Sequence, residues 1–130
     1  VQRQQMLDGG GIEAPLGADG HYHLRADLNG TSVRFVVDTG ATTIALSRED
    51  ATRIGIDVDG LAFTGQARTA NGIVRTAPVL INSFAIGDIH DERVMAVVIE
   101  GEMDQSLLGM NYLSRFARVS MEGNRLVLER

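Results

Sequence analysis

The 130-residue chain contains no cysteine, no lysine and no tryptophan, and the first two absences narrow its chemistry. Without cysteine there is no disulfide, no thiolate zinc site and no thiol nucleophile. Without lysine there is neither a Schiff-base amine nor the lysine of a phosphate-binding P-loop. All 12 basic residues are arginines, and the net charge of −5 argues against a surface for nucleic acid.

Long apolar runs are also missing, since no stretch approaches the roughly 18 apolar residues of a membrane span. No signal peptide is visible at the start. Because the chain begins with Val1, we expect a processed or truncated form from which a targeting or anchoring segment has been removed. Residues 1–19 are polar and glycine-rich, so we expect a flexible arm or tether there, followed by one folded domain over 20–130.

The sequence does contain many short, strand-length segments separated by turn residues. The clearest pair is 21–28 and 32–37, which flanks Asn29-Gly30, a strong hairpin signal. Further strands are expected at 44–46, 63–70, 73–81, 84–88, 94–99, 118–121 and 126–128. Two short helices are expected, with N-caps at Ser47 and Asn111. This pattern predicts an all-β sandwich or barrel.

The most informative segment is Asp38-Thr39-Gly40, which directly follows the apolar run Phe35-Val36-Val37. Alone, such a triplet is weak evidence for a functional site, because it is also typical of a turn after a strand, in which the aspartate side chain accepts a hydrogen bond from the backbone nearby. A second signal lies some 70 residues further along, where Leu107-Leu108-Gly109 precedes the second expected helix. The combination is more specific than either part.

The two motifs together resemble those of retropepsin-type aspartic proteases, and the similarity extends from Gly20 to Leu128. Segments 107–113 and 123–128 are similar to a bacterial branch of that clan, whose members are commonly periplasmic and tethered by an N-terminal membrane segment. The resemblance implies a closed β-barrel of the acid-protease type (one lobe), with a hairpin flap and a ψ-shaped loop crossing. It also implies a periplasmic location, with membrane contact only through an anchor outside this chain.

The same resemblance implies roles for individual residues. Asp38 is the catalytic aspartate, Thr39 interlocks with its counterpart in a second copy, and Gly40 helps to orient the carboxylates. The ψ-loop beneath Asp38 is formed by Leu107, Leu108 and Gly109. The flap and substrate pockets are expected to use Thr69, Ala70, Asn71, Gly72, Ala41, Ile73 and Val74. Two departures from retroviral members are Met110, where those have arginine, and a flap tip without a run of glycines.

Aspartic protease chemistry requires two carboxylates that share one proton. This chain contains Asp-Thr-Gly once, so the second aspartate must come from another copy. We therefore predict a homodimer that cleaves extended polypeptide with water activated between two Asp38 side chains. No metal and no cofactor are expected to take part.

Two alternatives are weighed against this prediction. The same fold could serve as a non-catalytic peptide-binding or dimerisation module. A metal site is the other alternative, from the pair His21 and His23 or the cluster Asp88, His90 and Asp91, although no metal-binding motif supports it. The acidic segment 100–104 is expected to be a solvated loop.

Overall fold

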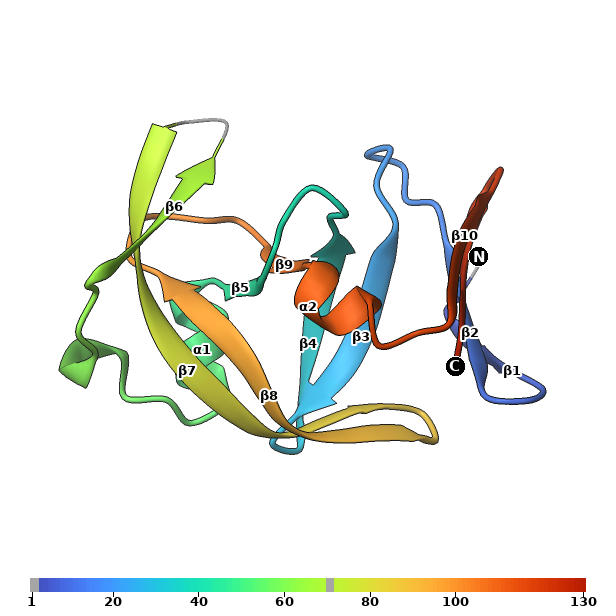
Figure 1. Cartoon of the computed structure of the whole chain (residues 1–130), viewed down its shortest axis with the longest axis horizontal. Coiled ribbons are helices and arrows are strands. Elements are labelled where there is room, and N and C mark those ends of the chain that lie inside the picture. The colour runs from blue at the N-terminus through green and yellow to red at the C-terminus, as the bar shows by residue number, and fades with distance from the viewer. Residues whose placement is uncertain (1–2, 70–71) are drawn as a thin grey trace.

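The computed structural model describes residues 3–69 and 72–130, and most of their regular structure is β-strand (Figure 1). In chain order the elements are β1 (Gln5–Leu7), β2 (Gly11–Pro15), β3 (His23–Leu28), β4 (Thr31–Val37), β5 (Ile44–Leu46), α1 (Arg48–Arg53), the 3₁₀ turn η1 (Val58–Gly60), β6 (Gly65–Thr69), β7 (Gly72–Ile86), β8 (Ile89–Ile99), β9 (Ser106–Leu108), α2 (Met110–Leu113), β10 (Arg118–Glu122) and β11 (Arg125–Glu129). No helix of the described residues is long and apolar enough to cross a membrane.

Six strands form a closed barrel. They follow one another in the order β3-β4-β9-β5-β8-β7, and β7 pairs with β3 to complete the circle. The aromatic residues Phe35, Phe84 and Tyr112 are fully buried in its core. The ring centroids of Phe35 and Phe84 are 5.9 Å apart, and those of Phe84 and Tyr112 are 4.4 Å apart. Together with the short helices α1 and α2, this confirms the predicted closed all-β barrel.

Local chemistry explains the first hairpin, β3–β4. Asn29 and Gly30 have φ values of 52° and 85°, the left-handed region that a tight hairpin turn requires and that these two residues tolerate. After the turn, β4 ends in three consecutive buried residues, 35–37, because it lies between β3 and β9. The strand therefore delivers Asp38 directly from the core to one end of the barrel.

Strand β7 differs from the prediction of two separate strands at 73–81 and 84–88. It runs without interruption for 15 residues, and β8 pairs with most of its length. The polar pair Asn82-Ser83 does not break it, because the backbone N–H of Asn29 donates to Ser83 O at 2.9 Å and Asn29 Oδ1 accepts from Ser83 N at 3.1 Å. A residue from another hairpin thus satisfies the polar backbone at this point.

The second sheet, with the order β1-β2-β11-β10, corrects the expectation of a flexible arm over 1–19. Strand β2 pairs with β11 along its whole length, and Ile12 and Ala14 are only 0% and 1% exposed. The prediction is wrong for residues 5–15, because Ile12 and Ala14 both point into the core at the two-residue period of a strand. The neighbouring glycines and polar residues concealed that period in the sequence.

Candidate active site

Asp38 is the first residue after β4. Strand β4 lies beside β9, which comes from much later in the chain (Figure 1). Strand β4 is parallel to β9, with Val37 opposite Leu108, and Asp38 N–H donates to Leu108 O at 3.0 Å. Strand β5 pairs with the other side of β9, where Ala45 lies opposite Leu107. The loop that carries Asp38 therefore leads from β4 to β5, the two strands on either side of β9.

The carboxylate of Asp38 is half-buried and has a defined orientation. Gly40 N–H donates to Asp38 Oδ1 at 2.9 Å, and Ala41 N–H donates to Asp38 O at 3.1 Å. These bonds form the local turn that an aspartate at this position can make with its own backbone. Thr39 and Gly40 are exposed. The turn thus presents one carboxylate and an exposed hydroxyl at the end of the barrel.

Gly109 lies directly beneath this loop and has no room for a side chain. A Cβ atom there would be 2.6 Å from Thr43 O and 2.9 Å from Ala41 O. The next residue, Met110, donates its N–H to Ala41 O at 2.8 Å. Glycine is therefore needed for the close approach of the two segments rather than for a left-handed backbone.

Asn111 is not a helix cap, contrary to the sequence prediction, since Gly109 occupies the N-cap position of α2. Its backbone N–H donates to Thr42 O at 2.9 Å. Its side-chain Oδ1 accepts from Ile44 N at 2.8 Å, and its Nδ2 donates to Met95 O at 2.7 Å. Asn111 thus fastens the end of the Asp38 loop to β8. Sequence reasoning assigned it no such role, although an asparagine beside an apolar motif was a visible signal.

A buried polar network supports the same region from the other side. Ser106, which is 0% exposed, accepts from Ser47 N at 3.0 Å and donates to Asp50 Oδ2 at 2.6 Å. Ser47 Oγ accepts from Asp50 N at 3.1 Å, which confirms the predicted cap of α1. This network attaches α1 to β9, the strand beneath Asp38.

A hollow of about 590 Å³ adjoins Asp38. Three polar residues that sequence analysis did not assign to the protease site line it, namely His21, Asp104 and Gln105, beside apolar residues 36, 37 and 107. Tertiary folding alone brings them there, since they come from the loop before β3 and the loop before β9. The space beside the carboxylate is thus bounded by apolar and hydrogen-bonding groups together.

The two histidines suggested as a metal-binding pair have different surroundings. His21 lines the hollow beside Asp38, whereas His23 does not. Its Nε2 lies 2.9 Å from Asp19 Oδ2, and this hydrogen bond lowers the pKa of the Asp19 carboxyl. In the other suggested metal cluster, His90 Nε2 lies 3.0 Å from Ser83 Oγ, and Asp91 is bonded to arginine. Within residues 3–69 and 72–130, no group of three or more histidine and acidic side chains is placed to hold a metal ion.

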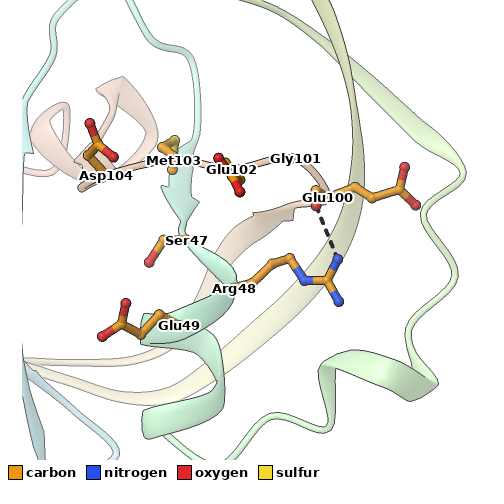
Figure 2. Close-up of a pocket in the computed structure, with 8 residues that line it drawn as sticks. All are labelled: Ser47, Arg48, Glu49, Glu100, Gly101, Glu102, Met103 and Asp104. Carbon is orange, nitrogen blue, oxygen red and sulfur yellow. Dashed lines mark hydrogen bonds between the residues drawn. The ribbon is translucent and has the colours of Figure 1, made fainter.

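A second hollow, of about 420 Å³, lies between the start of α1 and the acidic loop after β8 (Figure 2). Arg48 Nη1 donates to Glu100 O at 3.2 Å across it. Figure 2 shows the carboxylates of Glu49, Glu100 and Asp104 pointing in different directions rather than towards a common point. Asp104 borders both hollows, so the acidic loop forms the rim of the Asp38 site on this side.

Strands β6 and β7 form the hairpin predicted to be the flap, and it extends beyond the barrel (Figure 1). Thr69 Oγ1 donates to Gly72 O at 2.8 Å, and Gly72 has a φ of 110° that favours glycine. Ala70 and Asn71 lie outside the described residues.

The two residues of this hairpin suggested to line a substrate pocket, Ile73 and Val74, lie on different faces of it. Ile73 and Val74 are neighbours in a strand and therefore point to opposite faces. Ile73 is 63% exposed, whereas Val74 shares its face with Ala67 and the buried Thr76.

Comparisons with known proteins agree with this geometry. The family model described as "gag-polyprotein putative aspartyl protease" matches residues 24–115. An uncharacterized protein of Rickettsia prowazekii is 40% identical over 110 residues, and one encoded in the cobV 5′ region of a Sinorhizobium species is 40% identical over 111. Each alignment covers 85% of this chain, but the chain spans only about half the length of these relatives, 47% and 48%.

Among solved structures, a retropepsin-like aspartic protease from Rickettsia conorii is similar with a TM-score of 0.84 and 39% identity, covering 92% of this chain and 98% of that one. The protease of EIAV has a TM-score of 0.63 at 17% identity, covering 76% and 90%. At that identity the likeness shows the fold alone. On the match to the family model and the Rickettsia structure, this chain belongs to the retropepsin-like aspartic protease family.

Proposed function

We propose that this chain is an aspartic endopeptidase that is active as a homodimer. The observation that carries the proposal is the turn at residues 38–40, in which a half-buried carboxylate is oriented by Gly40 N–H and flanked by an exposed Thr39. A single chain supplies one Asp-Thr-Gly, and the reaction needs two carboxylates. A two-fold axis beside this turn would bring the second Asp38 into place.

The chemistry follows from two carboxylates so close that they share one proton. The ionised Asp38 takes a proton from a water molecule, whose oxygen attacks the carbonyl carbon of the peptide bond. The protonated Asp38 donates its hydrogen bond to the carbonyl oxygen as charge develops there. Proton transfer to the amide nitrogen then lets the C–N bond break, which yields an acid and an amine without a covalent enzyme intermediate.

We propose that the substrate is polypeptide in an extended conformation, held between the loop of Asp38 and the hairpin β6–β7. An extended peptide satisfies its backbone by strand-like hydrogen bonds and presents alternate side chains to pockets. The hollow beside Asp38 offers apolar walls from Val36, Val37 and Leu107 for one of those side chains.

The decisive experiment compares the chain with its Asp38→Asn variant on a diverse peptide mixture between pH 4 and pH 7, with products identified by mass spectrometry. We expect cleavage by the unaltered chain, inhibition by pepstatin and loss of cleavage in Asp38→Asn. Asp59→Asn is the matched control, because Asp59 also precedes a glycine, has a 96% exposed side chain and does not line the hollow beside Asp38. A dimer that binds peptides without cleaving any of them would instead identify a peptide-binding module.

We also propose a periplasmic location with membrane attachment through a segment outside this chain. Its support is the resemblance of segments 107–113 and 123–128 to the bacterial branch. Protection from an externally added protease in intact cells, lost when the outer membrane is permeabilised, is the expected result; a cytoplasmic fraction would contradict it.

A further inference from the structure

The outward face of β7 and β8 carries apolar side chains at positions where a barrel normally presents polar ones. Over residues 77–81 and 94–98, side chains of the core alternate with side chains that point outwards. Leu80 and Met95 lie opposite each other and are 46% and 51% exposed. Pro78 and Val97 form the next pair on the same face, the former exposed and the latter half-buried. Two adjacent apolar pairs make a contiguous patch, a feature typical of binding surfaces.

This patch continues into the wall of the hollow beside Asp38. Val97 lies opposite Ala45 of β5, and Ala45 lies opposite Leu107 of β9. Residues opposite each other on neighbouring strands point to the same face of a sheet, and Leu107 lines the hollow. An apolar row therefore leads from the hollow across β5 to the exposed pairs of β8 and β7. We call residues 45, 78, 80, 95 and 97 the apolar stripe.

The length of the stripe suits a further part of an extended substrate. Strand β7 also forms the flap hairpin with β6, so a peptide between this hairpin and the Asp38 loop has the stripe on its way out (Figure 1). In the sheet, β5 and β8 separate β9 from β7, which corresponds to about 14 Å at ordinary strand spacing. An extended peptide covers that distance with about four residues, and side chains an even number of positions apart point the same way. A peptide with one side chain in the hollow can therefore place another on the stripe.

We propose that the apolar stripe binds an apolar side chain of the polypeptide substrate, about four residues from the side chain in the hollow beside Asp38. The inference rests on the proposed peptidase activity and adds a determinant of specificity outside the hollow. The occupant is substrate rather than a separate partner, because the stripe is continuous with a wall of the site itself. A homodimer carries the stripe twice, so it favours long substrates over short ones.

Peptides that differ at one position test the stripe. A peptide that the chain cleaves is made with leucine or glutamate at each position roughly three to six residues from the scissile bond. At one of these positions leucine should give a kcat/KM about tenfold higher than glutamate, because only leucine buries apolar surface against the stripe. Leu80→Arg should reverse that order, since it removes apolar surface and offers a positive charge to glutamate. This variant should cleave a peptide too short to reach the stripe at the unaltered rate.

Ser32→Arg is the matched control, because it adds the same charge at an exposed strand position outside the stripe. It should keep the preference for leucine, and thermal unfolding should show that both variants are folded. Binding of the same peptides to Asp38→Asn is measured by fluorescence anisotropy.

The outcomes separate the stripe from the activity. If cleavage is equal for leucine and glutamate at every position, or if Leu80→Arg keeps the original order, the stripe is wrong and the proposed activity stands. If no peptide is cleaved but the leucine peptide binds more tightly than the glutamate peptide, the stripe stands and the activity is wrong. Neither cleavage nor a difference in binding would overturn both. If Leu80→Arg changes only self-association in sedimentation velocity, the stripe binds a second copy and the proposal is overturned.

Discussion

Replacing Gly109 by alanine tests whether the loop of Asp38 depends on close backbone contact. The added Cβ would lie 2.6 Å from Thr43 O, whereas ordinary van der Waals contact begins at 3.4 Å. The loop must therefore withdraw by about 0.8 Å, and the hydrogen bond between Met110 N and Ala41 O opposes that movement. Forcing a methyl group into a packed site costs roughly 1–3 kcal/mol.

The expected consequences are a loss of stability and a larger loss of activity. For a domain of this size the stability term lowers the melting temperature by roughly 5–10 °C. Displacement of a positioned catalytic group by nearly 1 Å reduces the rate about 100-fold. Calorimetry and the rate of peptide cleavage measure the two effects separately.

Gly101→Ala provides the control, because nothing lies within 4 Å of a Cβ at Gly101 and the residue is exposed. That variant should unfold and cleave as the unaltered chain does. If Gly109→Ala does the same, the tight crossing described here is wrong. If Gly109→Ala loses stability without any change in rate, the contact holds the fold together but does not position Asp38.

Two further predictions concern other contacts. Asn111→Ala leaves the backbone N–H of Ile44 without its acceptor and Met95 O without its donor, and should cost about 1–3 kcal/mol in urea unfolding. Asn111→Asp keeps the acceptor for Ile44 but places a carboxylate oxygen against Met95 O, so it should cost at least as much at neutral pH. Burial favours the neutral form of Asp91, but hydrogen bonds and charge from Arg130 outweigh it and lower the pKa of Asp91. Since the folded state then binds this proton more weakly than the unfolded state, the stability that Asp91 contributes should be lost as the pH falls from about 4 through the lowered value. Urea midpoints should show a weaker decline over that range in Arg130→Gln; an equal decline would contradict this assignment.

Features that depend on neighbouring residues could be predicted from the sequence. The turns at Asn29-Gly30 and Gly123-Asn124 and the cap at Ser47 all follow from the chemistry of a few adjacent positions. The strand ending in Asp38-Thr39-Gly40 was recognisable for the same reason, since three apolar residues and a turn motif are contiguous.

Features that depend on distant partners could not be predicted in this way. Strand β2 is ordered by β11, more than 100 residues away in the chain, so its own glycine-rich surroundings suggested an arm. The continuity of β7 past Ser83 depends on Asn29, and the role of Asn111 depends on Ile44 and Met95. At Ser83 and Asn111, a partner that is remote in sequence forms hydrogen bonds with a polar residue that looked like a break or a cap.

The pairing of β2 with β11 has a consequence for how the protein is made. Strand β11 lies between β2 and β10, so neither sheet neighbour of β11 can be in place before residues 125–129 have been synthesised. Contacts between residues so far apart in sequence form slowly, because the long intervening chain must first be ordered. The hairpin whose tip accepts a hydrogen bond from Tyr22 is thus completed only after almost the whole domain has been synthesised. A nascent chain would in this way carry Asp38 well before the strand that completes this sheet has been made.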